Sequence, residues 1–336
     1  MPDRRTLWEI EVPFRRTLET VTGPIGSRRS VVVAVAIDGV TGWGEAPAFP
    51  SGRFGTAAEA FEDLATEDEP SVPIARAALQ AAIADAEARA AGVALHTHLG
   101  GTDDAVMARH PIGLTDAEAI GVEAAWLQTH GITAVKLKIT PGRDRAVVES
   151  LRAQLPDLDI GVDANGSYAE PGDLTWLDAA RVSFVEQPFP PGDLTKHAAL
   201  RERIATPVCL DEAVPSPGAV ERALTAGAAD QISVKVNRSG LEALGEILAI
   251  TSGTGVSVRI GGTFDTSIGR RHVLAAATLP PIVDAEAGPP SAYLASDVVG
   301  YPAVVDGQVK PDSTPGIGVV PDRRRLDEMA IRSTTI

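Results

Sequence analysis

The sequence predicts an α/β fold in which a small α+β unit precedes a closed barrel of alternating strands and helices. Three observations support this prediction. The chain has 336 residues, too many for one minimal core and typical of a barrel with a smaller domain. Its first hundred residues mix extended stretches with alanine-rich helical stretches. Beyond Gly100-Gly101, six short apolar strands alternate with helical segments at regular spacing, which favours a closed barrel over an open doubly wound sheet.

The first unit is expected to hold a small sheet and two helices. Its predicted strands are rich in β-branched residues or adjoin a glycine-rich turn, and they span residues 7–13, 30–38 and 39–45. Its predicted helices have helical spacing and many alanines, and they span residues 56–64 and 74–91. The tail after Gly300 is rich in Pro and Gly and is expected to pack back on this unit.

The second part of the chain repeats one unit, a short apolar strand followed by a helical stretch. The predicted strands span residues 134–139, 159–163, 182–186, 208–211, 231–234 and 257–260. Helical segments between them include residues 144–154 and 219–226. This alternation implies βαβ units and a parallel sheet. No Rossmann glycine fingerprint or phosphate-binding loop follows any of these strands.

Composition narrows the possible partners and compartments. The net charge of −15 disfavours binding to nucleic acid or to an anionic membrane. No apolar run approaches the roughly 20 residues that cross a bilayer, and no signal-peptide pattern opens the sequence, so we expect a cytoplasmic protein. Cys209 is the only cysteine, which excludes an intramolecular disulfide. The oligomeric state stays open, and a homo-oligomer is compatible with the sequence.

Charged residues stand at the ends of the predicted barrel strands. Lys136 and Lys138 lie on one strand, and each later strand adds one residue after 23 to 25 positions: Asp163, Glu186, Asp211 and Lys235. One βα unit separates each from the next. In a barrel, this spacing places all of them on the C-terminal rim around one cavity, where barrel active sites lie.

Three of these residues are carboxylates, Asp163, Glu186 and Asp211. Three carboxylates that share a small space need a compensating cation. All-oxygen ligands with room for substrate oxygens indicate Mg²⁺. For each residue alone the alternative is a helix N-cap, since Asp is favoured there. Three carboxylates on successive strands at matched spacing favour a metal site over three separate helix N-caps.

The lysines lie on either side of the carboxylates. Lys138 precedes them around the barrel and Lys235 follows them, so the two are expected to face each other across the cavity. A partly desolvated lysine near another cation can act as a base near neutral pH. The metal would stabilise the enediolate that forms when a carboxylate substrate loses its α-proton. Lys136 is expected to tune its neighbour, and a surface charge or an ion pair is the alternative for it.

These residues resemble the enolase superfamily and, within it, the muconate cycloisomerase subgroup. The resemblance covers almost the whole chain, and its specificity comes from the order of the motifs. These are Gly42-Trp-Gly-Glu45, Lys136-Leu-Lys138, Asp163-Ala-Asn165-Gly, Glu186-Gln-Pro, Asp211-Glu212, Lys235, the loop from Gly261 to Gly269, and Pro315-Gly-Ile-Gly-Val319. Relatives of the mandelate racemase type have a histidine opposite the first lysine, and the lysine here disfavours that subgroup.

The resemblance implies a modified (β/α)₇β TIM barrel with an N-terminal α+β capping domain and one Mg²⁺. The capping domain would span residues 1–101, completed by the tail 302–336, and the barrel residues 102–301. By similarity, Asn165 and Glu212 would surround the metal and the lysines. Asp265 stands where many subgroup members have Glu, which implies a catalytic role, and the alternative is an Asp that caps its loop.

The resemblance also implies a small-molecule carboxylate substrate. The stretch from Gly261 through His272 is most similar to o-succinylbenzoate synthases and N-succinylamino acid racemases. Dehydration to o-succinylbenzoate in menaquinone synthesis is therefore the leading expectation, with succinylamino acid racemisation as an accompanying activity. Dipeptide epimerases, in which an Asp-x-Asp pair holds the substrate ammonium, and cycloisomerases are the alternatives. Asp284-Ala-Glu286 stands at that place here, and ordinary strand-end polarity is the favoured interpretation. A non-catalytic binding or structural relative is the alternative outside enzymes. Arginines in the first-domain loops 15–29 and 47–54 are candidates to meet a substrate carboxylate.

Overall fold

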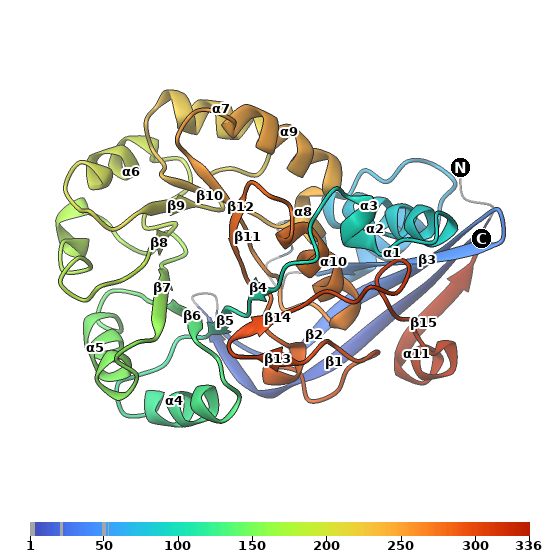
Figure 1. Ribbon diagram of the computed structural model, residues 1–336, viewed down its shortest axis with the longest axis horizontal. Coiled ribbons are helices and arrows are strands. Elements are labelled where there is room, and N and C mark those ends of the chain that lie inside the picture. Colours follow the sequence, from blue (N-terminus) through green and yellow to red (C-terminus); the bar gives the residue numbers. More distant parts are fainter. Residues whose placement is uncertain (1–3, 21–22, 49–51, 53) are drawn as a thin grey trace.

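A computed structural model describes residues 4–20, 23–48, 52 and 54–336. Figure 1 shows two parts: a ring of strands and helices, and an antiparallel sheet with its own helices beside the ring. The two ends of the chain lie close together on that sheet. Backbone hydrogen bonds join Arg5 to Ile336 in both directions at 2.9 Å.

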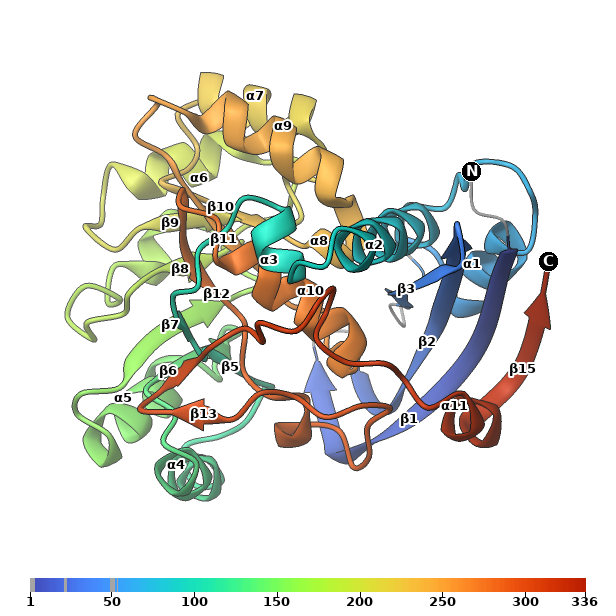
Figure 2. The ribbon, with the colours of Figure 1, turned by 45° about the vertical axis from the view of Figure 1, so that its right-hand side comes forward.

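The antiparallel sheet belongs to the predicted capping unit. Its strand order is β15-β1-β2-β3, with β1 at Arg4–Thr20, β2 at Gly23–Ile37, β3 at Val40–Pro47 and β15 at Ala330–Thr335. Helices α1 (Ala57–Leu64), α2 (Pro73–Ala90) and α3 (Leu95–His98) accompany it. A Cβ on Gly44 would come within 2.1 Å of the Ala78 carbonyl oxygen. The glycines of Gly42-Trp-Gly-Glu45 therefore allow α2 to lie directly against β3, and Figure 2 shows α2 between this sheet and the barrel.

Eight parallel strands form the barrel sheet, in the order β12-β11-β10-β9-β8-β7-β6-β5. Their bounds are β5 His110–Ile112, β6 Ala134–Lys138, β7 Asp159–Asp163, β8 Val185–Glu186, β9 Val208–Leu210, β10 Gln231–Val234, β11 Ser257–Ile260 and β12 Ile282–Ala285. The connecting helices are α4 Ile120–Thr129, α5 Arg145–Gln154, η1 Pro171–Leu174, α6 Leu194–Arg201, α7 Pro217–Thr225, α8 Val236–Ser239, α9 Leu241–Thr251 and α10 Ser267–Ala277. Seven helical connections between eight strands give the predicted (β/α)₇β order, and the largest apolar core lies between strands and helices.

The first and last barrel strands meet through side chains more than through a ladder. The Gly288 N–H donates to the Arg109 carbonyl at 3.2 Å. The buried Arg109 guanidinium donates to Asp284 at 2.7 Å, to Asp159 at 2.9 Å and to the Val135 carbonyl at 2.8 Å. Arg109 thus fastens β12 to β6 and β7 across the seam.

The C-terminal tail contacts both parts of the molecule. Its first segment forms a hairpin of β13 (Val304–Val305) and β14 (Gln308–Val309), and β14 pairs with β4 (Val106–Met107) beside the barrel. Its last segment, α11 (Arg323–Met329) and β15, packs on the capping sheet. The division at residues 101 and 301 stays a prediction.

The predictions located all six inner strands and missed the strands at the two ends of the barrel sheet. The strand predicted over residues 182–186 is shorter in the structure, where β8 spans Val185–Glu186, although the Ser183 N–H still donates to the Ile160 carbonyl of β7 at 2.9 Å. The strands β5 and β12 were missed, and β5 has only three residues with Pro111 in the middle. The connection after β7 holds the 3₁₀ helix η1.

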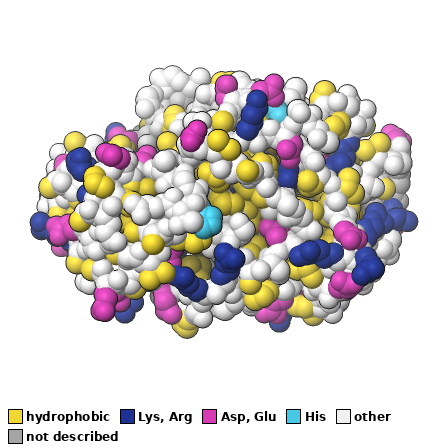
Figure 3. All heavy atoms as spheres, turned by 60° about the horizontal axis from the view of Figure 1, so that its bottom comes forward, with side chains coloured by type: hydrophobic (Ala, Val, Ile, Leu, Met, Phe, Trp, Pro, Cys, Tyr) yellow, Lys and Arg dark blue, Asp and Glu magenta, His cyan; other side chains and the backbone are white. Residues whose placement is uncertain are grey.

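One carboxylate of the capping sheet reaches the barrel. Glu45, at the end of the Gly-Trp-Gly-Glu motif, accepts from Thr266 Oγ1 at 2.6 Å and from the Gly269 N–H at 2.9 Å. An anion is favourable at a helix N-terminus, so Glu45 docks the capping sheet on α10. Cationic and anionic side chains are interspersed over the face in Figure 3. Among the described residues no helix combines the length and the apolar character that crossing a membrane requires.

Candidate active site

Two lysines enter the barrel from β6. Lys136 and Lys138 stand at alternate positions, so both side chains lie on the inner face of the strand. Lys136 Nζ lies 2.7 Å from Glu186 Oε1 and 2.5 Å from Glu286 Oε1. Lys138 Nζ lies 3.2 Å from Asp163 Oδ2. Lys138 is therefore nearest to the first of the three strand-end carboxylates.

The third lysine reaches the same carboxylates from the other side. Lys235 follows β10, and its Nζ bonds to Asp211 Oδ2 and lies 3.7 Å from Glu186 Oε1. The buried Arg238 donates from Nη1 to the other Asp211 oxygen at 2.8 Å, and its guanidinium stacks 4.6 Å from the centre of the Phe54 ring. Arg238 was not predicted from the sequence, although it stands three residues after Lys235, a spacing of about one helical turn that places both side chains on the same side.

The strand order places Lys138 and Lys235 across the barrel. Three strands, β7, β8 and β9, separate β6 from β10 in one direction, and β11, β12 and β5 separate them in the other. The carboxylates Asp163, Glu186 and Asp211 come from the three strands on the first path. A substrate between the lysines would therefore have the carboxylates along one side.

The charges of this cluster compensate one another. Burial lowers the pKa of Lys136 and Lys235, but the surrounding carboxylates outweigh burial and raise both pKa values above that of an ordinary lysine. Burial raises the pKa of Asp163, but the ammonium groups of Lys138 and Lys136 outweigh it and hold the pKa at about 2. Burial also raises the pKa of Asp211, but the ammonium group of Lys235 outweighs burial and lowers this pKa below that of an ordinary aspartate. Lys136 and Lys235 are therefore protonated and Asp163 and Asp211 ionised in this arrangement.

The donor set fits a hard cation. Within the described part of the chain, no group of three carboxylate, imidazole or thiol side chains is already arranged as a metal-binding site. Ammonium groups stand in that space, since Lys136 and Lys235 both approach Glu186 Oε1. The other oxygen of Glu186 is buried and accepts no hydrogen bond from the described residues. Carboxylate oxygens alone, with ammonium groups as the present counter-charge, suit Mg²⁺ better than a thiolate-seeking metal.

Asn165 and Glu212 lie beside the cluster, as the resemblance implied. Asn165 accepts from Lys138 Nζ and donates to Glu212 Oε1 at 3.0 Å. Its backbone has φ +44°, a left-handed conformation that Asn tolerates better than most residues. Burial and the neighbouring carboxylates of Asp211 and Asp163 raise the pKa of Glu212 to about 7. The roles of Asn165 and Glu212 in the reaction stay predictions.

Asp265 lies outside the lysine and carboxylate cluster. It is fully buried and accepts from Asn237 Nδ2 at 2.9 Å and from Thr263 Oγ1, and Arg270 Nη2 lies 3.5 Å away. These contacts fix the loop that leads from β11 to α10. They favour the alternative of a loop-capping Asp, and the predicted catalytic role stays untested.

The structure separates Asp284 from Glu286. Asp284 is held in the barrel interior by Arg109 at 2.7 Å and by Arg259 at 2.6 Å. Glu286, two residues on, lies higher in the barrel, bonds to Lys136 and lines the cavity. Of these two acidic residues, Glu286 lines the cavity and can contact a substrate there, whereas Asp284 does not line it.

The three lysines line a cavity of about 340 Å³ together with Asp163 and Asp211, while Glu186 is fully buried behind them. The capping domain supplies the apolar wall of this cavity, with Phe14, Leu18, Ile25 and Phe54. Arg28 also lines it from β2, and burial lowers the pKa of this arginine to about 10 in spite of the nearby Asp265 and Glu45. Arg28 belongs to the predicted loop 15–29, of which Val21 and Thr22 lie outside the described residues. Of the predicted loop 47–54, residues 49–51 and Arg53 lie outside them too.

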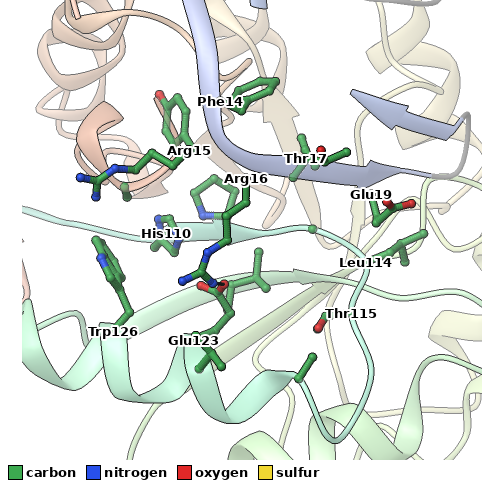
Figure 4. Close-up of a pocket in the computed structure, with 18 of the residues that line it drawn as sticks. Phe14, Arg15, Arg16, Thr17, Glu19, His110, Leu114, Thr115, Glu123 and Trp126 are labelled. Carbon is green, nitrogen blue, oxygen red and sulfur yellow. Dashed lines mark hydrogen bonds and ion pairs between the residues drawn. The ribbon is translucent and has the colours of Figure 1, made fainter. Parts of the chain in front are cut away.

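A second cavity of about 510 Å³ lies beside the first and shares five lining residues with it: Phe14, Leu18, Pro111, Ile112 and Phe264. Figure 4 shows it between β1 and α4. Arg16 of β1 lies 3.1 Å from Glu123 of α4 across it, with His110 and Trp126 at one end. It contains none of the lysines or strand-end carboxylates, so the chemistry belongs to the smaller cavity.

His110, on the wall of the second cavity, gives the first prediction. Burial lowers its pKa to about 3, far below the ordinary value, so the unfolded chain binds the extra proton between pH 6.5 and pH 3. His110 therefore contributes stability above pH 6.5 that is lost as the pH falls. The free energy of unfolding should decrease by up to about 1.4 kcal/mol per pH unit from this residue. Urea titrations of the parent and His110→Gln, whose side chain does not titrate, isolate the effect. The stability difference between them should shrink from pH 6.5 to pH 4.5, and a constant difference would contradict the assignment.

Comparison with known proteins agrees with this geometry. Residues 119–325, which carry every strand-end lysine and carboxylate, match the family model described as enolase C-terminal domain-like. The chain belongs to the enolase superfamily. It is an enzyme of that superfamily, and the predicted barrel with its capping domain is confirmed.

Several relatives extend this finding along the chain. The o-succinylbenzoate synthase of Bacillus subtilis (strain 168) is 31% identical over 92% of this chain and 90% of its own length. The N-succinylamino acid racemase of Thermus thermophilus is 33% identical over 74% of this chain and 69% of its own. A solved enolase superfamily member from Listeria innocua superposes with a TM-score of 0.90 at 26% identity, covering 100% of this chain and 98% of its own.

Proposed function

We propose that this enolase superfamily enzyme removes the α-proton of a small carboxylate substrate with the help of one Mg²⁺. The observation that supports the proposal is the position of Lys138 and Lys235, which face the cavity from opposite strands of the barrel. Asp163, Glu186 and Asp211, between them, would hold the cation. When bound, Mg²⁺ would offset the negative charge that gathers on the substrate carboxylate as the proton leaves.

The residues of the chain divide the remaining tasks. A lysine accepts a proton only in its neutral form, so Lys138 and Lys235 must first lose the carboxylate partners they have here. Engagement of those carboxylates by a cation would release both side chains. Lys136 would stay charged beside Glu186 and Glu286 and act on the neighbouring Lys138 through its charge. The apolar wall of the capping domain would exclude water, which strengthens these interactions.

The substrate class we propose is that of o-succinylbenzoate synthase. In this reaction a cyclohexene carboxylate first loses its α-proton to a base and then its β-hydroxyl, so that one water is eliminated, and the product serves menaquinone synthesis in the cytoplasm. The curated relatives with this activity support the proposal, and those with N-succinylamino acid racemase activity support racemisation as a second activity of the same site. Both reactions begin with the same proton abstraction.

The remaining alternatives are weaker. A dipeptide epimerase would use both acidic residues of Asp284-Ala-Glu286 for the substrate ammonium, yet two arginines already hold Asp284 away from the cavity. A cycloisomerase needs the same lysines and has no further observation in its favour. A non-catalytic relative would have no reason to keep Lys136 and Lys235 buried beside their carboxylate partners, which is costly.

A competitive assay tests the substrate class. The purified enzyme with Mg²⁺ should have its highest kcat/KM with the o-succinylbenzoate precursor or with N-succinylamino acids, and a lower value with dipeptides. Dominant dipeptide activity would contradict the proposal. Glu286→Gln should then cost far more with dipeptides than with N-succinylamino acids, because a buried substrate cation would lose its partner.

A further inference from the structure

A charged layer lies in the barrel interior directly beneath the lysines and carboxylates. We call it the arginine floor and define it by Arg109, Phe184, Arg259 and Asp284. Arg259, on β11, is 1% exposed, and its guanidinium lies 3.6 Å from the centre of the Phe184 ring. It donates to Asp284 Oδ2 at 2.6 Å. Arg109 reaches the same Asp284 oxygen from the seam.

The sequence makes room for this layer. A Cβ on Gly161 of β7 would lie 2.1 Å from the Phe184 ring. Only glycine at this position lets the ring lie across the barrel interior, where it forms the surface on which Arg259 stacks. A cation over an aromatic face is favourable, and more so when it is desolvated.

Stability alone gives little reason for the arginine floor. Barrel interiors are usually filled with bulky branched apolar side chains. A buried ion pair is often no more stabilising than apolar residues of the same volume, because both charges lose their hydration. The chain nevertheless buries two arginines with Asp284 at this level. Departures of this kind are typical of functional sites.

One contact links the floor to the proposed metal site. Arg259 Nη1 lies 3.5 Å from Glu186 Oε2, the oxygen that accepts no hydrogen bond, while Glu186 Oε1 bonds to Lys136. The guanidinium thus faces one oxygen of this carboxylate from below and leaves the other turned toward the lysines. Within the described residues Arg109, the other floor arginine, forms its ion pairs with Asp159 and Asp284 and none with Glu186.

We infer that Arg259 is a positioning residue that holds the inner oxygen of Glu186 and so presents this carboxylate to the cation. The inference rests on the proposed magnesium site. Asp284 anchors the guanidinium on one side and Phe184 supports it from below, so Arg259 has little freedom to move. Groups that orient a metal-ligating side chain typically contribute 10- to 100-fold to metal affinity.

Calorimetric titration of Mg²⁺ into metal-free protein tests the inference with a matched control. Arg259→Met and Arg109→Met each remove one buried guanidinium from Asp284 and replace it with an apolar chain of similar length. Arg259→Met should weaken Mg²⁺ binding by about 10- to 100-fold. Arg109→Met should lower the melting temperature yet leave Mg²⁺ affinity near that of the parent.

The outcomes separate this inference from the function on which it rests. A parent protein that binds no Mg²⁺ overturns both. If the parent binds Mg²⁺ and Arg259→Met binds it as tightly, or if both variants weaken it equally, the inference fails while the proposed site stands. Should Arg259→Met not fold, Arg259→Lys replaces it, because one ammonium keeps the charge but cannot bridge Asp284 and Glu186. Its affinity for Mg²⁺ should also fall below that of Arg109→Met, and equal affinity would contradict the inference.

Discussion

Lys138→Ala is expected to lower kcat for dehydration by about 10²- to 10⁴-fold, the usual contribution of a general base. Lys138 and Lys235 lie on strands that face each other across the barrel, so each addresses one face of a substrate between them. Dehydration needs one base, and we assign that role to Lys138. Lys235→Ala should slow dehydration less, because Lys235 would act there through its charge alone. Racemisation needs a base on each face, so either variant should stop it.

Steady-state kinetics with the o-succinylbenzoate precursor and with N-succinylamino acids measure these effects. Lys196→Ala is the matched control, since Lys196 lies on α6 and pairs with the exposed Glu170. It should retain the kcat of the parent. A Lys138→Ala variant that dehydrates normally would contradict the whole catalytic assignment.

The three carboxylates are expected to be equally indispensable. Asp163→Asn, Glu186→Gln or Asp211→Asn should weaken Mg²⁺ binding by more than the roughly 10- to 100-fold that loss of an orienting group costs, and turnover should vanish with it. Each replacement keeps the size of the side chain and removes one negative charge from the site. Calorimetry measures the affinity, and a kinetic assay over a range of Mg²⁺ concentrations measures the turnover.

Two controls keep this result interpretable. Loss of a carboxylate removes one ion-pair partner from a lysine of the cluster, which costs stability, so the melting temperature of each variant has to be recorded. Glu170→Gln removes an exposed carboxylate of the barrel and should change neither affinity nor turnover. Near-normal activity of all three site variants in EDTA-treated buffer would show that no divalent metal takes part.

The sequence was sufficient to predict the inner barrel strands and what stands at their ends. A βα unit of constant length puts a polar residue at the same height after every 23 to 25 positions, and this spacing is visible without coordinates. Asp163, Glu186 and Lys235 could therefore be assigned to one rim. Side chains two residues apart on a strand point to the same face, so Lys136 and Lys138 of β6 could be placed on one face as well.

Contacts between distant strands could not be predicted in this way. Arg259 lies in an apolar strand, and nothing in its neighbours along the chain indicates Phe184, Asp284 or Glu186 as its partners. Sequence spacing also treats Asp284 and Glu286 as one pair. The barrel separates them because residues two apart on a strand lie at different heights in its interior.

The strands that close the barrel were missed for a local reason. Only three residues of β5 pair with β6, and Pro111 in their middle lacks an N–H. Side-chain contacts also join the first and last strands of the barrel, since Arg109 donates hydrogen bonds to Asp159 and Asp284. Patterns within single strands do not predict such side-chain contacts between residues that are far apart in the sequence.

Exchange of the α-proton in D₂O tests the central claim most directly. Single enantiomers of an N-succinylamino acid are incubated with Mg²⁺ and the parent, Lys138→Ala or Lys235→Ala, and proton NMR follows the loss of the α-proton signal. The parent should exchange both enantiomers, and EDTA should stop it. Each lysine variant should exchange only the enantiomer whose proton faces the remaining lysine. Equal exchange of both enantiomers by Lys235→Ala at the rate of the parent would contradict the account of two opposed bases.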